Sequence, residues 1–193
     1  MKDKLLLHSC CAACSIYVLQ QLMSDWDLTV YFYDPNIHPR QEYNQRRDEM
    51  KAYCEKLKLD FLEGPYDTKK WLEKTKGLEQ EPEKGKRCDI CFDLRLGETA
   101  RLAQAENFAA FATVLTISPH KDAKKISLIG QKLSQIFGVD FLDRDWKKND
   151  GFKIACDLSK QENFYRQNYC GCLYSKKVYK LASSKNSTNL SAL

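Results

Sequence analysis

Short apolar runs alternate with longer amphipathic segments along most of this chain. The apolar runs are typical of buried strands, and they cover residues 5–7, 28–33, 59–62, 108–117 and 139–142. The segments between them repeat apolar residues every three or four positions, as a helix with one buried face does. These predicted helices cover residues 12–23, 40–58, 88–107, 123–137 and 152–168. The alternation predicts a parallel sheet with helices on both faces, which is a three-layer α/β sandwich.

Two stretches depart from this alternation. Residues 65–87 are polar and rich in Lys and Glu, and they predict an irregular insertion or lid. Residues 176–193 are polar and rich in Ser and Asn, which predicts a flexible C-terminal tail. The part before the tail, residues 1–175, has the length of one domain. We therefore expect a single α/β domain, and Gly138 directly after the fourth predicted helix is the residue type that commonly ends one.

Composition and charge agree with a globular cytoplasmic protein. Hydrophobic residues make up 43% of the chain and charged residues 30%. No run approaches the roughly 20 apolar residues that span a bilayer. The apolar run at the N-terminus ends at His8 and is too short for a signal peptide. We expect a cytoplasmic protein without a membrane partner, and the net charge of +5 permits a nucleic-acid partner without requiring one.

Nine cysteines are many for a cytoplasmic chain, and they point to metal or redox chemistry. Seven of them form three clusters, which are Cys10, Cys11 and Cys14, then Cys88 and Cys91, then Cys170 and Cys172. Cys54 and Cys156 lie in predicted helices without a cysteine neighbour, so we interpret both as packing residues.

The first two clusters are predicted to bind a metal. Both lie where a helix begins, and helix N-termini favour the thiolate form that iron and zinc bind. One hypothesis is a 4Fe–4S cluster held by Cys10, Cys11, Cys88 and Cys91, since four thiolates are its usual ligands. The alternative is a structural zinc held by Cys11, Cys14, Cys88 and Cys91, which form two C-x-x-C pairs. Spacing alone leaves both open.

The third cluster is predicted to be redox-active. Cys170 and Cys172 can close only a small, strained disulfide ring, and strained disulfides are easily reduced. We expect a dithiol that carries electrons or protons, and the alternative is that both are further metal ligands. His120 follows the fourth predicted strand at the same edge of the sheet, and it is a candidate substrate contact or general acid. His8, before the first cluster, is interpreted as a core histidine.

Basic residues give only a weak signal for nucleic acid. Residues 69–87 hold seven Lys or Arg against four Glu. Arg40, Arg46 and Arg47 lie at the start of a predicted helix, where phosphate binding and a solvated helix face explain them equally well. The first strand-to-helix loop carries cysteines where a nucleotide-binding loop has Gly and Ser, so ATP use is unsupported.

Five short motifs occur in one order along roughly residues 5–175. They are Leu7-His8-Ser9-Cys10-Cys11-Ala12-Ala13-Cys14, Tyr33-Asp34-Pro35-Asn36-Ile37-His38-Pro39, Arg87-Cys88-Asp89-Ile90-Cys91-Phe92, Ser118-Pro119-His120-Lys121 and Tyr165-Arg166-Gln167-Asn168-Tyr169-Cys170-Gly171-Cys172. Together they resemble the QueH family of cobalamin-independent epoxyqueuosine reductases. Two positions depart from the family pattern, with Ala13 in place of Pro and Asp34 in place of Asn, and neither touches one of the four proposed cluster cysteines.

The resemblance implies a reaction, a fold and a set of functional residues. The reaction is the last step of queuosine synthesis, in which the epoxide of epoxyqueuosine at the tRNA wobble position is removed by two-electron reduction. The fold is that of the adenine-nucleotide α-hydrolase (HUP-like) group. The implied 4Fe–4S ligands are Cys10, Cys11, Cys88 and Cys91, and the implied second redox element is Cys170 with Cys172. An additional mononuclear iron is compatible with the resemblance, with Cys14 or a nearby Asp as a ligand.

Epoxide removal needs two electrons, an electrophile on the epoxide oxygen and a source of protons. The expected partners are tRNA that carries epoxyqueuosine and an external one-electron donor of the ferredoxin or flavodoxin type. Cys170, Cys172 and His120 are the candidate catalytic residues. The alternative functions are a zinc-stapled tRNA-binding or tRNA-modifying protein without redox chemistry, and a cysteine-rich metal carrier or thiol sensor.

Overall fold

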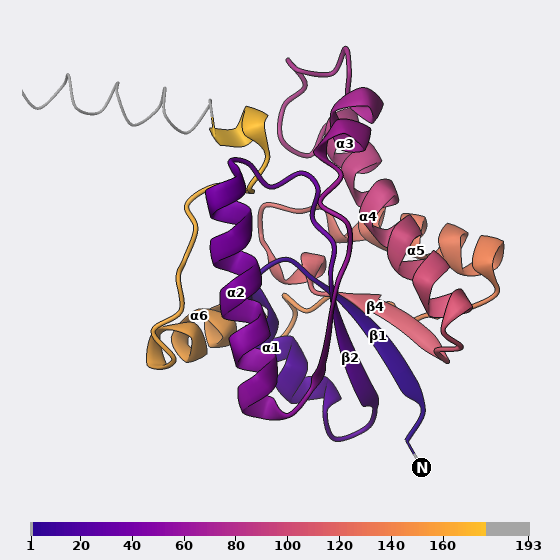
Figure 1. Cartoon of the computed structure of the whole chain (residues 1–193), viewed down its shortest axis with the longest axis vertical. Helices are drawn as coiled ribbons and strands as arrows, with labels where there is room; N and C mark the ends of the chain where they lie inside the picture. The colour runs from indigo at the N-terminus through magenta and orange to yellow at the C-terminus, as the bar shows by residue number, and fades with distance from the viewer. Residues whose placement is uncertain (1, 177–193) are drawn as a thin grey trace, which may run out of the picture.

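Five parallel strands form one sheet in the computed structural model, which describes residues 2–176 (Figure 1). The strands are β1 (Lys4–Ser9), β2 (Asp27–Phe32), β3 (Asp60–Glu63), β4 (Ala110–Thr113) and β5 (Asp140–Phe141). Their order is β3-β2-β1-β4-β5, so the chain moves outward from β1 and then returns to its other side. In the centre, Leu7 is in register with Val30 of β2 and with Ala112 of β4. The predicted parallel α/β sheet is confirmed.

The helices form two layers, one on each face of the sheet. They are α1 (Ala12–Leu22), α2 (Arg40–Leu57), α3 (Thr68–Lys74), α4 (Lys86–Ala105), α5 (Ala123–Phe137) and α6 (Gly151–Gln161). Helices α1, α2 and α6 cover one face, and α4 packs with α5 on the other (Figure 1). Leu5, Leu6 and Leu7 of β1 are completely buried because helices lie on both sides of the sheet. Gly138 ends α5 with a left-handed φ of 65°, as its position after the apolar pattern predicts.

The predicted strand 108–117 is wrong beyond Thr113. The side-chain oxygen of Thr113 accepts a hydrogen bond from the backbone N–H of Leu115 at 3.1 Å, which turns the chain out of the strand. A short 3₁₀ helix, Leu115–Ile117, follows and stays buried. Because strand and 3₁₀ helix are equally apolar here, the hydrophobic pattern could not separate them.

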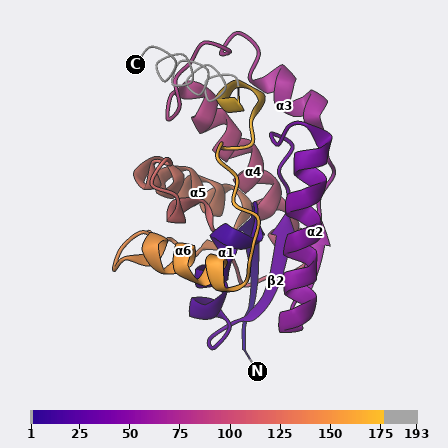
Figure 2. The ribbon, with the colours of Figure 1, turned by 90° about the vertical axis from the view of Figure 1, so that its left-hand side faces the viewer.

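The predicted helix 152–168 is wrong beyond Gln161, where α6 ends. Asn163 has a left-handed φ of 55°, and the chain then leaves the helix and runs along α2 (Figure 2). The backbone N–H of Tyr165 donates to the Glu49 carboxylate of α2 at 2.7 Å. Contacts with a distant helix therefore determine the path of residues 162–172, which we call the C-terminal segment.

The predicted irregular insertion 65–87 contains a helix. The Asp67 carboxylate caps α3 by accepting from the backbone N–H of Lys70, and turns connect α3 to α4. Trp71 of α3 is almost fully buried. The predicted tail lies outside the described residues from residue 177 on, and the assignment of the chain to a single domain stays a prediction. No helix within residues 2–176 has the length and apolar character to cross a membrane.

Candidate metal and redox centre

The carboxyl ends of β1, β2 and β4 bring three loops to one edge of the sheet. Cys10 follows β1, Asp34 comes shortly after β2, and residues 118–121 come after β4. The connections from β1 and from β4 leave the sheet in opposite directions, so the sheet has a topological switch point between these neighbouring strands. Ligand sites of open parallel sheets lie at this kind of switch point.

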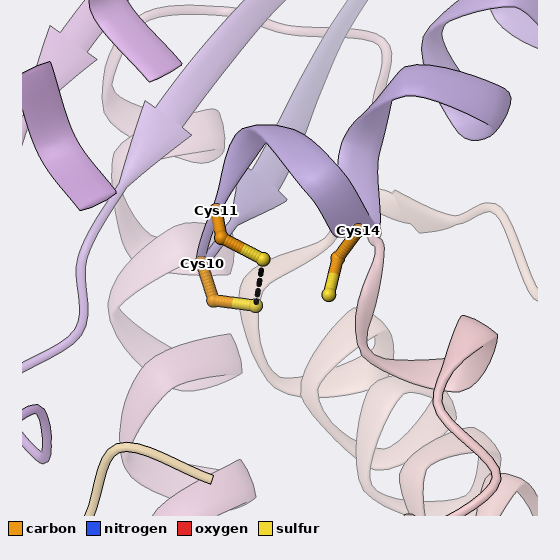
Figure 3. Close-up of side chains that lie close together, drawn as sticks. All are labelled: Cys10, Cys11 and Cys14. Atoms are coloured by element: carbon orange, nitrogen blue, oxygen red, sulfur yellow. Dashed lines mark hydrogen bonds between the residues drawn. The ribbon is translucent and has the colours of Figure 1, made fainter. Parts of the chain in front are cut away.

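The first cysteine group lies at the N-terminus of α1. The sulfur atoms of Cys10, Cys11 and Cys14 all lie within 4.8 Å of one another (Figure 3). Cys11 is the residue before the helix, with an extended backbone, and Cys14 belongs to the first turn. The thiols of Cys10, Cys11 and Cys14 therefore converge on one point.

These three thiols hold their protons strongly. The hydrogen bond from Cys10 to Cys11, together with burial, raises the pKa of Cys10. The hydrogen bond with Cys10 and burial raise the pKa of Cys14 to about 12. The hydrogen bond with Cys10 lowers the pKa of Cys11, but the contact with Cys14 and burial outweigh it and raise the value to about 12. Three crowded, buried thiols lose their protons together when a cation balances their charge, and a metal ion does this.

The second and third cysteine clusters line one cavity. Its walls are formed by Cys88, Cys91, Cys170 and Cys172, with Trp71, Glu83, Arg87, Phe92, Arg95, His120 and Lys121. Cys88 and Cys91 come from the first turns of α4, and the other two come from the C-terminal segment. The candidate His120 therefore lines the same cavity as the candidate dithiol.

Cys170 and Cys172 have pKa values that are shifted in opposite directions. Both are free thiols rather than a disulfide. The neighbouring Cys172, supported by the charges of Lys121 and Arg95, lowers the pKa of Cys170 well below its ordinary value despite burial. The neighbouring Cys170, together with burial, raises the pKa of Cys172. The lowered pKa favours the thiolate form of Cys170, which is the nucleophilic form of a cysteine.

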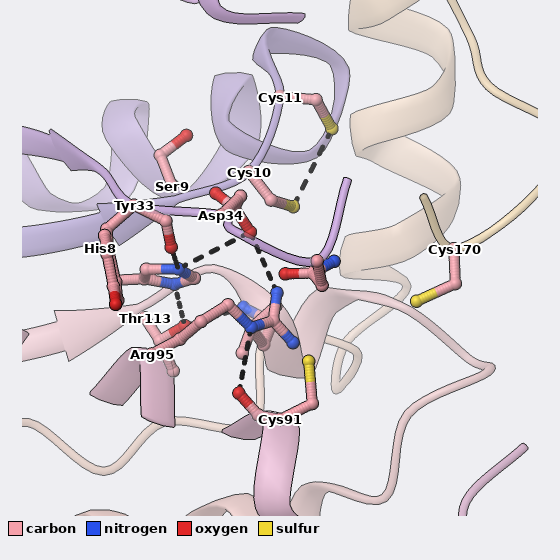
Figure 4. A network of polar contacts seen from close by, with 12 residues as sticks. His8, Ser9, Cys10, Cys11, Tyr33, Asp34, Cys91, Arg95, Thr113 and Cys170 are labelled. Carbon is pink, nitrogen blue, oxygen red and sulfur yellow. Dashed lines mark hydrogen bonds and ion pairs between the residues drawn. The ribbon is translucent and has the colours of Figure 1, made fainter. Parts of the chain in front are cut away.

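Arg95 supplies positive charge between the two cysteine groups. Its side chain is 2% exposed, and it donates to the Asp34 carboxylate at 2.9 Å and to the backbone carbonyl oxygen of Cys91 at 3.2 Å. The sulfur atoms of Cys10, Cys91 and Cys170 point towards the space around its guanidinium group (Figure 4). Within the described part of the chain, its Nη2 atom is buried without a hydrogen-bond partner.

Lys121 adds a second cation. Burial opposes its charged form, but the nearby sulfur atoms of Cys170, Cys10 and Cys14 favour it and raise its pKa. Because Lys121 interacts electrostatically both with Cys170 and with the first cysteine group, the two sets of cysteines lie next to the same positively charged space. Such a space favours an anionic metal–thiolate group.

His8 is a core histidine, as interpreted from the sequence. It is completely buried, with Nδ1 3.0 Å from the Thr113 hydroxyl and Nε2 3.3 Å from the carbonyl oxygen of Tyr33. Burial, and then the charge of Arg95, lower the pKa of His8. Its neutral ring lies 3.8 Å from the Asp34 carboxylate and packs that group in place.

Arg46 has neither of the two roles considered from the sequence, because its side chain is only 1% exposed. It forms an ion pair with Glu42 at 2.6 Å and donates to the backbone carbonyl oxygens of Tyr169 at 3.4 Å and Cys170 at 3.5 Å. Glu42 also accepts from the hydroxyl group of Tyr165 at 2.9 Å. The Arg46–Glu42 pair therefore anchors the C-terminal segment that carries the dithiol.

Neither Arg95 nor the burial of Arg46 was predicted from the sequence, although a signal existed for each. Arg95 lies on the same helix face as Phe92 and Thr99, which are buried. Arg46 lies on the face of α2 that buries Tyr43 and Met50. A charged residue on the buried face of an amphipathic helix indicates a buried ion pair.

Alanine in place of Gly171 is expected to displace the dithiol turn. Gly171 has a φ of +106°, and an added Cβ would lie 3.0 Å from Ile37 Cγ1 and 3.2 Å from Arg46 Nη1. We expect Gly171→Ala to lower the free energy of unfolding by about 1–3 kcal/mol in chemical denaturation. Gly77→Ala is the matched control, because its φ is +82° but nothing lies within 4 Å. Equal losses in the two variants would contradict a role for the contacts around Gly171.

Comparison with known proteins decides the family. Residues 5–178 match the family model described as epoxyqueuosine reductase QueH. The chain belongs to the QueH family. The family's curated member from Acinetobacter baylyi is 43% identical over 175 residues, which cover 90% of this chain and 80% of that protein. The member from Thermotoga maritima is 34% identical over 173 residues, which cover 88% of each chain.

The resemblance of the five motifs to QueH is thereby confirmed, and the chain is assigned to the epoxyqueuosine reductases, which are oxidoreductases. The curated member from Histophilus somni, 42% identical, covers 90% of this chain and 72% of that protein. These relatives do not favour the alternative of a zinc-stapled protein without redox chemistry.

A solved structure supports the fold of this QueH-family chain. The U34-tRNA thiolase NcsA from Methanococcus maripaludis, determined with its [4Fe-4S] cluster, superposes with a TM-score of 0.54 over 97% of this chain and 68% of that protein. Sequence identity is 13%, so this likeness concerns the fold. The predicted HUP-like α/β architecture is confirmed.

Proposed function

We propose that this chain removes the epoxide of epoxyqueuosine in tRNA with a 4Fe–4S cluster held by Cys10, Cys11, Cys88 and Cys91. Membership in the QueH family carries the proposal. The gathering of seven cysteines at one edge of the sheet supports it. The substrate is the epoxyqueuosine nucleotide at the tRNA wobble position, and the electrons come from an external one-electron donor of the ferredoxin or flavodoxin type.

The residues present fit such a cluster. Cys10 and Cys11 supply thiols from one side of Arg95, and Cys91 supplies one from another (Figure 4). The unpartnered Nη2 atom of Arg95 is a buried donor, and an anionic group between the cysteines would satisfy it. A cluster with four thiolate ligands is anionic, and it would transfer electrons one at a time when bound.

The additional mononuclear iron has candidate ligands at the same edge. Cys14 lies within 4.8 Å of both neighbouring thiols and is not needed by the proposed cluster. The Oδ2 atom of Asp34 is buried without a hydrogen-bond partner in the described part of the chain. One thiolate and one carboxylate are ligands that iron accepts, and we propose Cys14 and Asp34 for this role.

Cys170, Cys172 and His120 are proposed as the catalytic residues. Removal of an epoxide to leave an alkene breaks two C–O bonds, forms one C=C bond, and consumes two electrons and two protons to release water. Oxidation of the Cys170 thiolate and the Cys172 thiol to a disulfide releases two electrons and one proton. His120 on the cavity wall is proposed to donate the second proton. The external donor then reduces the disulfide.

The double variant Cys170→Ser, Cys172→Ser is expected to reduce epoxyqueuosine at least about 100-fold more slowly, since Ser cannot form the disulfide. The measurement is conversion of tRNA nucleosides by mass spectrometry. Iron content and visible absorption should stay at the parent level, because neither residue is a proposed cluster ligand. The single variant Cys156→Ser in α6 is the control and should turn over normally. Full turnover by the double variant would exclude the dithiol role.

The proposed function is tested directly on anaerobically prepared, iron-loaded protein. Incubation with epoxyqueuosine-containing tRNA and a low-potential reductant should yield queuosine, identified by mass spectrometry. The protein should absorb broadly near the blue end of the spectrum and bleach with dithionite. A colourless protein with one zinc per chain would exclude the cluster, and iron-loaded protein without turnover would exclude the reaction.

A further inference from the structure

The side-chain amide of Gln167 lies against the first cysteine group. Its Nε2 atom is 3.3 Å from the sulfur of Cys11 and 3.8 Å from the sulfur of Cys14. The NH₂ group of an amide donates hydrogen bonds, and a thiolate sulfur only accepts them. The amide therefore points its NH₂ group at Cys11. A metal-bound thiolate of Cys11 would accept a hydrogen bond from this group.

The backbone around Gln167 is held on both sides. Before it, the N–H of Tyr165 donates to Glu49 at 2.7 Å. After it, the hydroxyl group of Tyr169 donates to the carbonyl oxygen of His38 at 2.6 Å, and the N–H of His38 donates to the carbonyl oxygen of Gly171 at 2.8 Å. A side chain on a segment fixed at both ends keeps its direction.

The oxygen of the Gln167 amide makes no hydrogen bond that would favour the opposite orientation. The Oε1 atom of Gln167 is buried and has no hydrogen-bond partner within residues 2–176. A metal-bound thiolate at Cys11 cannot donate a hydrogen bond to this oxygen, so it favours the orientation that points the NH₂ group at the sulfur. Among the hydrogen bonds of the described chain, that group contacts only the sulfur atoms of Cys11 and Cys14.

We propose that Gln167 is a positioning residue that donates a hydrogen bond to the cluster-bound thiolate of Cys11 and raises the cluster's reduction potential. The inference rests on the proposed function, because it takes Cys11 as a cluster ligand. Reduction adds negative charge that spreads onto the thiolate sulfurs. A donor to one of these sulfurs stabilises the reduced state more than the oxidised state.

The test compares Gln167→Met and Gln167→Glu with the parent protein after iron loading. Met keeps the length of the side chain and removes the donor, and Glu also adds negative charge. The readout is the one-electron midpoint potential from a dye-mediated titration followed by electron paramagnetic resonance. For Met we expect a fall in the equilibrium constant for reduction of roughly three- to tenfold, or about 30–60 mV at 59 mV per tenfold. Glu should lower it further.

Asn168→Met is the matched control, because it removes the same chemical group from the adjacent, exposed residue. Its potential should equal that of the parent. Equal potentials in Gln167→Met and the parent, with equal iron content, would overturn the inference. A parent protein that takes up no cluster would instead overturn the proposed function, so the two failures are distinguishable.

A second measurement needs no variant and decides the matter if the Gln167 variants lose iron. The parent protein is labelled with ¹⁵N in its glutamine side chains, and its reduced cluster is studied by pulsed electron paramagnetic resonance. A hydrogen bond from Gln167 predicts a weak ¹⁵N coupling to the cluster. Labelling of asparagine side chains should give none, and the absence of a coupling from glutamine would overturn the inference.

Discussion

Cys10→Ala is expected to lose bound iron and at least about 100-fold of its epoxyqueuosine reductase activity, since a cluster ligand is removed. Iron analysis, visible absorption and conversion of tRNA nucleosides are the measurements. The sulfur of Cys10 is buried and lies 4.0 Å from that of Cys11, the second proposed ligand in this loop. Cys156→Ala, which changes a cysteine outside the three clusters, is the control and should keep iron and activity.

The same experiment separates the two proposed ligand sets, because they differ in one residue. A 4Fe–4S cluster on Cys10, Cys11, Cys88 and Cys91 predicts that Cys14→Ala keeps its four cluster irons. A zinc site on Cys11, Cys14, Cys88 and Cys91 predicts the reverse, with metal lost from Cys14→Ala and kept in Cys10→Ala. Metal retention in Cys10→Ala would therefore contradict the cluster assignment.

Arg95→Met is expected to lower the free energy of unfolding of the metal-free protein by about 3–5 kcal/mol, because it leaves the Asp34 carboxylate buried without its partner. Asp34 is 1% exposed, and Arg95 holds it at 2.9 Å. Chemical denaturation measures the loss. Arg101→Met on the same helix is the matched control, since the Arg101 side chain is 54% exposed and its pair with Glu98 should contribute less than about 1 kcal/mol. Equal losses of unfolding free energy in the two variants would contradict a stabilising role for the buried Arg95–Asp34 pair.

The loss in Arg95→Met should also grow with pH. Burial raises the pKa of Asp34, and Arg95 opposes that rise. Without Arg95 the folded-state pKa rises further above the unfolded value. The folded protein then binds a proton that the unfolded chain has released, so stability falls as pH rises through this window. Denaturation curves at acidic and at neutral pH measure the difference, and a loss that is independent of pH would contradict this account.

The arrangement of strands and helices was largely predictable from local patterns. A continuous apolar run such as Leu5-Leu6-Leu7 indicates a strand that is buried on both faces, and Gly138 indicates the end of a helix. The position of the cysteine loops at one edge follows from the parallel sheet, because the carboxyl ends of its strands share that edge. The length of α6 was not predictable, because its end depends on contacts of Tyr165 with α2.

The sequence by itself determined the α/β class, the three cysteine clusters and the family. The tertiary structure alone decided which clusters meet, since Cys88 and Cys91 share a cavity with a dithiol about eighty residues further along the chain. It also decided that Arg95 pairs with Asp34, 61 residues away, and that Gln167 contacts Cys11. The local spacing of apolar residues indicates which side chains are buried. The partner of a buried charge or thiol depends on how distant elements pack.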